Sequence, residues 1–470
     1  MKKLYKSILV LILSTVTIQS CNFLEVDPIG KTTIPKFFSD MEGLRASLPG
    51  TYSEVYNYYS TEFYKYPDVA GNMLYLNGIG TGADMVNQFN YTFTPENETE
   101  AVGYIWRKIY VAMANANNII EYSPALEEKF PTHIQEIKFI RAQALFIRAL
   151  SHFDLVRVYA QPYNFTADAS HIGVPVLLKT PGPSSNLGRN SVKETYDQIE
   201  KDLKLSIVEF GTNPFKDAYH ASKKASEALL SRVYLYKEQW DSVIKYSSLV
   251  IANTNLSTGT DYTDMYNKMA PGVESIFRLN GLKKSTTLGK FYNSQTPIYI
   301  PSDTLISLFD NPSDIRLSLL KNSEGKPICL KYYITSQVAE IDKHYDPFVL
   351  RLSEIYLNRA EAYLNKNMLA EAAADVKQII ARAYGKTPAE ITIDESSKEA
   401  LGAVIVKERT KELCFEAHNL FDITRQKRSL IRESKTNSTL KKLTYPNNKF
   451  ILPIPQTELN ANPNMVQNPL

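Results

Sequence analysis

Apolar residues recur at three- to five-residue steps along much of the chain, which is the spacing expected of helices that bury one face. In residues 133–159 the recurring positions include Ile137, Ile140, Leu145 and Phe153. The same pattern occupies residues 104–122, 192–209, 222–237, 241–252, 348–365, 369–383 and 400–422, and proline and glycine separate these segments. Strand-like stretches are few and short, at residues 91–94, 275–279, 298–300, 329–333 and 450–454. The pattern therefore predicts an all-α fold with a few short strands.

Two predicted helix pairs share the same turn. In each pair an aromatic residue ends the first helix, a large apolar residue follows a tight turn, and a small one opens the return helix. The two sets are Tyr234, Trp240 and Val243, and Tyr363, Leu369 and Ala372. Tetratricopeptide-type hairpins have this arrangement, because their helices pack only when small residues face bulky ones. The copies lie 129 residues apart, so the sequence predicts a helix-hairpin scaffold that is not a regular solenoid.

Two long segments, residues 58–99 and 255–345, interrupt the predicted scaffold. Loops of this length within a compact domain are usually functional. Both segments are rich in aromatic residues, and the first interleaves them with asparagine and glutamine. Rings can cover the C–H face of a sugar or a peptide backbone, while amides hydrogen-bond to groups at its edge. The residues predicted to contact a ligand are Tyr75, Asn77, Phe89, Tyr91, Tyr292 and Tyr299, although such rings can also simply pack within their own loops.

The first 20 residues have the pattern of a secretory signal peptide. Three lysines among the first six residues precede the apolar run Ile8–Leu13, and small or polar residues then lead to Cys21. The apolar run is too short to span a bilayer, which takes about 20 residues. The residues before Cys21 resemble a lipobox, which predicts that Cys21 is acylated and becomes the mature N-terminus. The alternative is an ordinary cleaved signal with a chance cysteine near its end.

The balance of charge limits which partners are expected, and the setting of the cysteines indicates whether a disulfide is expected. The chain has 53 Lys+Arg and 50 Asp+Glu, and removal of the three signal lysines balances the two signs. Without a basic surplus to neutralise phosphates, nucleic acid is not an expected partner. Cys329 and Cys414 both have apolar neighbours, which favours two separate buried thiols over a disulfide.

Motifs that carry catalysis are missing from the sequence. No two of the six histidines have the helical spacing common in metal sites, and no nucleophile elbow is present. The glycine-rich stretch Gly78–Gly82 has no phosphate-binding lysine after it and is interpreted as a loop. We therefore predict no catalytic residues, no metal ion and no cofactor, and a protein that is not an enzyme.

Motifs along the whole chain resemble the SusD/RagB family of Bacteroidetes surface lipoproteins. They lie at Cys21–Pro28, Trp106–Ile119, Arg141–Arg157, Ala228–Tyr236, Arg351–Ala362, Glu408–Arg425 and Leu452–Pro469. The last two are the most specific, and the departure within them is Ala417, where the family usually has glycine. The charged residues of these motifs, including Glu408, Glu412 and Glu416, lie at helical spacing and are interpreted as scaffold ion pairs rather than catalytic carboxylates.

The resemblance implies a fold, a partner and a location. The fold is a tetratricopeptide-like helical scaffold whose irregular insertions build the ligand pocket, within one domain at residues 21–470. The partner is a SusC-like TonB-dependent transporter, and the location is the cell outer membrane, reached by a lipid anchor on Cys21. The ligands of such proteins are mostly oligosaccharides, with peptides in some members. Oligosaccharide capture is therefore the leading hypothesis. The alternatives are peptide capture, a surface glycoside hydrolase and a helical adaptor.

Overall fold

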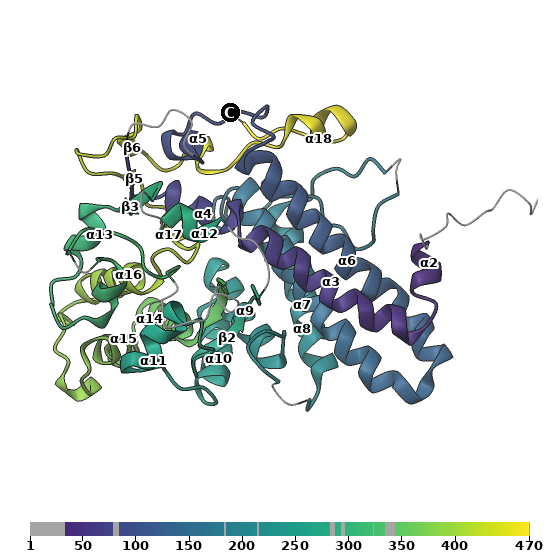
Figure 1. Cartoon of the computed structure of the whole chain (residues 1–470), viewed down its shortest axis with the longest axis horizontal. Coiled ribbons are helices and arrows are strands. Elements are labelled where there is room, and N and C mark those ends of the chain that lie inside the picture. Colours follow the sequence, from purple (N-terminus) through teal and green to yellow (C-terminus); the bar gives the residue numbers. More distant parts are fainter. Residues whose placement is uncertain are drawn as a thin grey trace, which may run out of the picture.

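The computed structural model describes residues 33–78, 84–182, 185–213, 216–282, 287–292, 297–322, 324–333 and 344–469 (Figure 1). The predicted signal peptide and Cys21 lie outside these residues. The helices are α2 (Ile34–Phe37), α3 (Met41–Tyr59), α4 (Glu62–Val69), α5 (Val86–Asn90), α6 (Ala101–Lys129), α7 (Ile134–Tyr159), α8 (Val192–Phe210), α9 (Lys223–Tyr236), α10 (Trp240–Ile251), α11 (Gly259–Asn267), α12 (Leu288–Tyr292), α13 (Asp303–Ser307), α14 (Leu352–Asn365), α15 (Leu369–Tyr384), α16 (Lys398–Leu413), α17 (Asn419–Arg425) and α18 (Gln456–Ala461). The strands are β1 (Leu74–Leu76), β2 (Ser275–Arg278), β3 (Tyr299–Pro301), β4 (Phe348–Arg351), β5 (Leu430–Ile431) and β6 (Lys442–Leu443).

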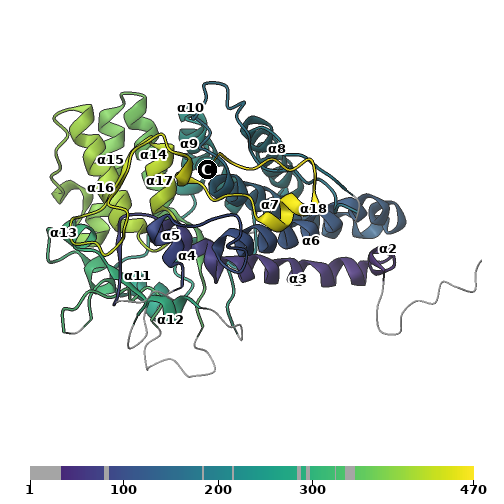
Figure 2. The ribbon, with the colours of Figure 1, turned by 90° about the horizontal axis from the view of Figure 1, so that it is seen from above.

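The longer helices form one continuous row. Each helix from α6 to α10 packs on its neighbour in the chain, α14 packs on α10, and α15 and α16 extend the row. Figure 2 shows α11, α12 and α13 gathered on one side of this row. The fold is mostly helical with a few short strands, as predicted. Within the described residues, the longest and most apolar helices still fall short of what a membrane span requires.

Local side chains set where several helices begin and end. The hydroxyls of Ser191, Ser222 and Ser397 each accept a hydrogen bond from the backbone N–H three residues later, at 3.1–3.2 Å. These are N-caps, which satisfy donors that the first turn of a helix leaves unpaired. Helix α15 ends at Gly385 with a φ of 65°, a conformation that glycine adopts without steric cost.

The two predicted hairpins are confirmed as α9–α10 and α14–α15. In both turns the backbone N–H five residues after the aromatic residue donates to the carbonyl of that residue, at 3.0 Å for Tyr234 and 2.9 Å for Tyr363. Glu238 and Asn367, at matching positions, both adopt left-handed φ values, of 56° and 59°. Because α10 packs on α14, the two copies are neighbours in space despite their separation in sequence.

The strands lie where distant parts of the chain meet. Strand β1 pairs antiparallel with β3, β2 with β4, and β5 with β6. The predicted strands at 275–279 and 298–300 correspond to β2 and β3, but the other three predictions are wrong. Tyr91 has a left-handed φ of 57°, and Leu452 donates to the carbonyl of Val158 at the end of a helix. Those stretches owe their apolar residues to burial against helices rather than to strand pairing.

The two predicted insertions contain more regular structure than their sequences suggested. The first holds α4, β1 and α5, and the second holds α11, β2, α12, β3 and α13. The β1–β3 pair joins them, with Leu74 opposite Pro301, Tyr75 opposite Ile300, and Leu76 opposite Tyr299.

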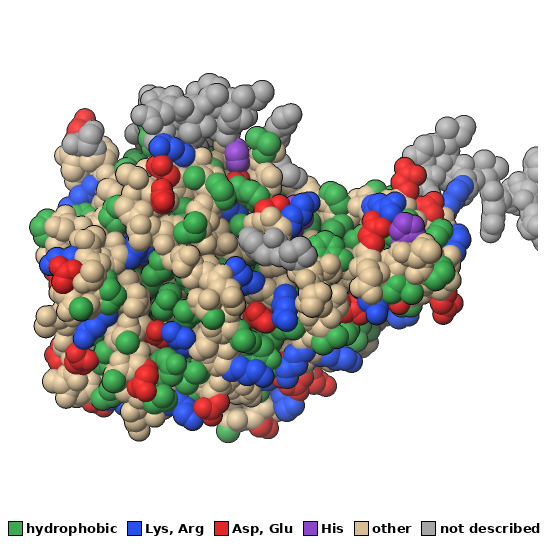
Figure 3. All heavy atoms as spheres, turned by 90° about the horizontal axis from the view of Figure 1, so that it is seen from below, with side chains coloured by type: hydrophobic (Ala, Val, Ile, Leu, Met, Phe, Trp, Pro, Cys, Tyr) green, Lys and Arg blue, Asp and Glu red, His purple; other side chains and the backbone are tan. Residues whose placement is uncertain are grey.

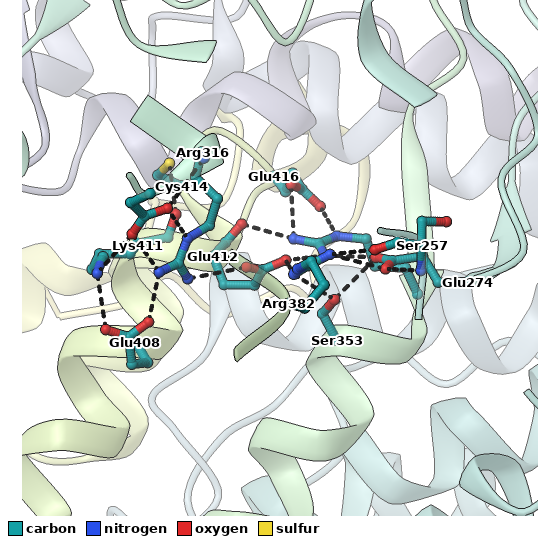
Figure 4. A network of polar contacts seen from close by, with 12 residues as sticks. Ser257, Glu274, Arg316, Ser353, Arg382, Glu408, Lys411, Glu412, Cys414 and Glu416 are labelled. Atoms are coloured by element: carbon teal, nitrogen blue, oxygen red, sulfur yellow. Dashed lines mark hydrogen bonds and ion pairs between the residues drawn. The ribbon is translucent and has the colours of Figure 1, made fainter. Parts of the chain in front are cut away.

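A buried ion network ties the second insertion to the scaffold (Figure 4). Arg351 lies 2.6 Å from Glu412, Arg382 lies 3.1 Å from Glu274, and Arg316 lies 2.7 Å from Glu408. Five cations face five carboxylates in the network, all nearly fully buried: Arg316, Lys331, Arg351, Arg382 and Lys411 against Glu274, Asp314, Glu408, Glu412 and Glu416. The predicted scaffold role of the glutamates is confirmed. Cys329 and Cys414, the cysteines of the described residues, are both buried and form no disulfide with each other, also as predicted.

Candidate functional site

Four of the six residues predicted to contact a ligand lie in the core. Phe89, Tyr91, Tyr292 and Tyr299 are each no more than 2% exposed. Phe89 packs edge-on against Tyr299 with ring centroids 5.5 Å apart, and Tyr292 stacks on Tyr332 at 5.3 Å. Other rings of the same insertions cover the faces of these four rings. We therefore do not propose that these four rings contact a ligand through their faces.

Tyr75 and Asn77 occupy a different environment at the end of β1. Tyr75 is half-buried in the strand, and burial, together with Glu433, raises the pKa of its phenol. Asn77 is exposed just beyond the strand, where its backbone N–H donates to Ile298 at 2.8 Å and its side-chain amide donates to Pro297 at 2.9 Å. Both bonds hold Asn77 against the second insertion.

A buried lysine lies beneath this end of the sheet. The side chain of Lys65 in α4 is fully buried, and its Nζ lies 2.6 Å from Asp84 Oδ2 and 3.2 Å from Thr287 Oγ1. The same ammonium lies 4.6 Å from the ring centroid of Phe291 in α12, a cation–π contact. The Tyr299 hydroxyl donates to the backbone carbonyl of Asp84 at 3.2 Å. One buried cation thus fixes groups from both insertions.

We call the exposed polar side chains of Asn77, Asp84 and Thr287, together with Tyr75 of strand β1, the insertion edge. A further ring of the second insertion is exposed. Tyr333 follows Tyr332, which stacks on Tyr292, and its own side chain is 44% exposed, the one tyrosine of the described residues exposed to that degree. The insertion edge therefore combines donors and acceptors on a rigid aromatic support, and the second insertion also offers one accessible ring, that of Tyr333.

A groove of about 450 Å³ lies elsewhere, between α6, residues 175–187 and the segment 455–465. Several of its polar side chains already have protein partners. Trp106 Nε1 donates to Glu458 at 3.3 Å, and Asn462 Nδ2 donates to Leu187 at 2.8 Å. Trp106 is only 5% exposed and offers little ring surface. The groove is therefore less suited than the insertion edge to a ligand rich in hydroxyl groups.

The surface charge is mixed. On the face drawn in Figure 3, basic and acidic side chains alternate over the described surface instead of gathering into a patch of one sign. Among the residues that the structure describes, no three His, Cys, Asp or Glu side chains gather as a metal site would require.

Comparison with known proteins identifies the family. Residues 22–235 match a family described as starch-binding and associating with the outer membrane, and residues 308–470 match the SusD family. The chain belongs to the SusD family. Members of the SusD family bind sugar and work with outer-membrane transporters. The resemblance inferred from the sequence motifs is confirmed.

Individual SusD-family relatives match along their whole length. The SusD-like protein P2 of Formosa agariphila is 24% identical, over 100% of this chain and 99% of the relative. A crystal structure of a candidate sugar-binding protein from Bacteroides vulgatus has a TM-score of 0.80 and 26% identity, covering 92% of this chain and 98% of that one. A SusD superfamily protein from Bacteroides thetaiotaomicron gives the same TM-score at 24% identity, with 92% and 100% covered.

Sequence reasoning did not select the polar base of the insertion edge. Lys65, Asp84 and Thr287 are ordinary residues in their local context, and their grouping depends on the meeting of two insertions. The available signal was the apolar setting of Lys65, which lies between Phe63, Tyr64, Tyr66 and Pro67. A lysine in such a run is either paired or functional, because an unpaired buried charge is strongly unfavourable.

Proposed function

We propose that this SusD-family protein captures oligosaccharides at the insertion edge and delivers them to a TonB-dependent transporter of the outer membrane. The observation that carries the proposal is the insertion edge itself, a set of exposed polar side chains on a buried aromatic base, within insertions that also carry the exposed ring of Tyr333. Sugars present hydroxyl groups at their edges and C–H groups on their faces, and this combination suits both. Family membership supports the same ligand class.

Pre-organisation strengthens the proposal. Asn77 is held by two hydrogen bonds to the second insertion, and Asp84 and Thr287 are held by Lys65. Groups already fixed in position lose little conformational entropy when a ligand binds. The residues proposed to contact the oligosaccharide are Tyr75, Asn77 and Tyr333.

Titration calorimetry of residues 22–470 against maltohexaose, xylohexaose, mannohexaose and a mixed tripeptide pool tests the ligand class. We expect heat with at least one hexasaccharide and about a tenfold weaker affinity for Tyr333→Ala and Asn77→Ala. Phe165→Ala is the matched control, because Phe165 is 39% exposed on the loop after α7 and lies outside both insertions. Heat with the peptide pool alone would favour peptide capture instead.

Catalysis is tested on the same preparation. We expect each hexasaccharide to remain intact after prolonged incubation with the pure protein, as judged by chromatography of the products. Release of shorter sugars that persists through repurification would overturn the binding-protein proposal and favour a glycoside hydrolase.

A further inference from the structure

Lys65 forms an ion pair whose two ends lie in different environments. Its own side chain is fully buried, between the fully buried Tyr64 and Tyr66, whereas the carboxylate of its partner Asp84 is 42% exposed. In the ion network of Figure 4, by contrast, both partners of each pair are buried. The Lys65–Asp84 pair thus presents the carboxylate to solvent and keeps the ammonium behind it.

A pair of this kind fixes the position of the exposed carboxylate. Removing an ammonium from water is strongly unfavourable unless an anion and further acceptors replace the lost hydration. Asp84 Oδ2 at 2.6 Å, Thr287 Oγ1 at 3.2 Å and the Phe291 ring at 4.6 Å supply that replacement. Movement of Asp84 away from Lys65 would leave the ammonium without its anion. The carboxylate is therefore held in one place.

We propose that Asp84 is a ligand-contacting residue of the insertion edge, where its carboxylate accepts hydrogen bonds from hydroxyl groups of the ligand. This inference rests on the proposed function and adds a specificity-determining residue to it. An ionised carboxylate only accepts, so it selects ligands that donate. Hydrogen bonds to a charged acceptor are about twice as strong as those between neutral groups. Thr287, which shares the Lys65 ammonium with Asp84, offers a further partner to a ligand with several hydroxyls.

Lys65 acts through Asp84 and is a positioning residue. Its ammonium is fully buried and cannot meet a ligand directly. It holds Asp84 of the first insertion and Thr287 of the second at one point, so the acceptor pattern of the edge depends on it. Lys65→Met keeps the apolar stem of the side chain, and the Asp84 carboxylate that it leaves unpaired is 42% exposed, so no uncompensated charge remains buried.

Calorimetry with maltohexaose, xylohexaose and mannohexaose on residues 22–470 tests both roles. We expect Asp84→Asn and Lys65→Met each to weaken binding of the recognised hexasaccharide at least tenfold. The double variant should bind no more weakly than Asp84→Asn alone, because Lys65 acts only through Asp84. Asp310→Asn is the control, since Asp310 is also an exposed carboxylate 2.7 Å from a lysine, Lys407, but lies outside the insertion edge.

Each outcome has a distinct meaning. Wild-type protein that binds no hexasaccharide overturns the proposed function and this inference with it. Wild-type protein that binds, with Asp84→Asn binding equally well, overturns the role of Asp84 and leaves the proposed function standing. A double variant much weaker than Asp84→Asn overturns the positioning role of Lys65. Melting temperatures of all variants within a few degrees of wild type exclude loss of folding as the cause.

Discussion

Asp68 lies in α4 with its carboxyl group wholly removed from solvent. Its Oδ2 accepts a hydrogen bond from the backbone N–H of Ala417 at 3.3 Å, while Oδ1 has no hydrogen-bond partner among the described residues. Burial raises the pKa of this carboxyl to about 8, although the nearby Lys331 opposes the shift. Asp68 is therefore protonated in the folded protein at neutral pH and ionised in the unfolded chain.

This difference predicts a pH-dependent stability. Between about pH 4 and pH 8 the folded state binds one more proton than the unfolded state at Asp68, so stability falls as pH rises through that window. Asp68→Asn removes the effect. We expect the stability of the variant relative to that of wild type to rise by about 2 to 4 kcal/mol between pH 5 and pH 8. Urea unfolding at four pH values measures the gain, and a flat difference would contradict it.

The control for this experiment is Asp310→Asn. Hydrogen bonding to Lys407 lowers the pKa of Asp310, so its protonation changes only below the tested window. We expect its stability difference from wild type to be constant between pH 5 and pH 8.

Single residues show where sequence reasoning stops. Tyr299 and Tyr333 lie in the same insertion and have similar aromatic settings, but Tyr299 is sealed by Phe89 and strand β1, whereas Tyr333 is 44% exposed. Which ring is covered depends on a segment more than 200 residues earlier in the chain. Composition indicated that the insertions are aromatic, but local sequence cannot tell the exposed ring from the buried ones.

At the scale of elements, a buried arginine holds the first insertion in place. Arg432 Nε donates to the carbonyl of Gly71 at 2.8 Å, and its Nη2 donates to that of Val69 at 3.1 Å, at the C-terminal end of α4. Its guanidinium lies 4.6 Å from the ring of Phe89 in α5. A cation at a helix C-terminus interacts favourably with the exposed carbonyl groups.

Arg432→Lys should therefore destabilise the protein. Lysine keeps the charge but cannot reproduce the planar fork of donors. We expect a loss of about 2 to 4 kcal/mol in denaturant unfolding, from several buried carbonyls left without donors. The control is Arg45→Lys, because Arg45 binds Glu136 at an exposed site, where solvent screening leaves such a pair little effect on stability. Equal losses for both variants would contradict the role of Arg432.

The ion network links the second insertion to the scaffold through Glu412. Burial alone would raise the pKa of Glu412, but Arg382, Arg351 and Arg316 hold it well below its usual range. Glu412→Gln leaves buried positive charge without compensation, which is expected to cost about 3 to 5 kcal/mol. In Glu412→Gln we expect amide hydrogen exchange in α11 and β2 to become faster than in wild type, by more than it does in α3. Glu395→Gln, which breaks a surface pair with Lys377, should leave exchange unchanged.

Elements differed in how well the sequence predicted them. The hairpins α9–α10 and α14–α15 were predictable because their turns depend on residues close together in sequence. The strand predictions at 91–94, 329–333 and 450–454 failed because short apolar runs have the same composition whether they pair with a strand or pack against helices.

At the scale of the whole molecule, the sequence motifs identified the family and so the fold, without any knowledge of distances. They did so because the charged residues at Glu408–Arg425 form contacts that the helical scaffold requires. The ligand site was not predictable in the same way, because its groups come from two insertions that only the folded chain brings together.

The predicted lipid anchor also belongs to this scale. We expect Cys21→Ser to abolish incorporation of labelled fatty acid and to shift the protein from the outer-membrane fraction to soluble fractions. The lipid on Cys21 is the predicted membrane attachment, so loss of the acylated cysteine should remove that attachment. An unchanged membrane fraction for Cys21→Ser would contradict the lipoprotein prediction, with Cys329→Ser as the control substitution at a buried thiol.

The pairing of β1 with β3 has a consequence for how the protein is made. Leu74 cannot pair with Pro301 until more than 220 further residues have been synthesised. The hydrogen bond from Arg432 to the carbonyl of Gly71 can form only later still. Contacts of such long sequence separation form slowly. The first insertion is therefore unfinished while the helices α6–α10 are already complete in sequence. Any chaperone that accompanies the chain across the periplasm would meet an aromatic surface that only the last third of the chain can cover.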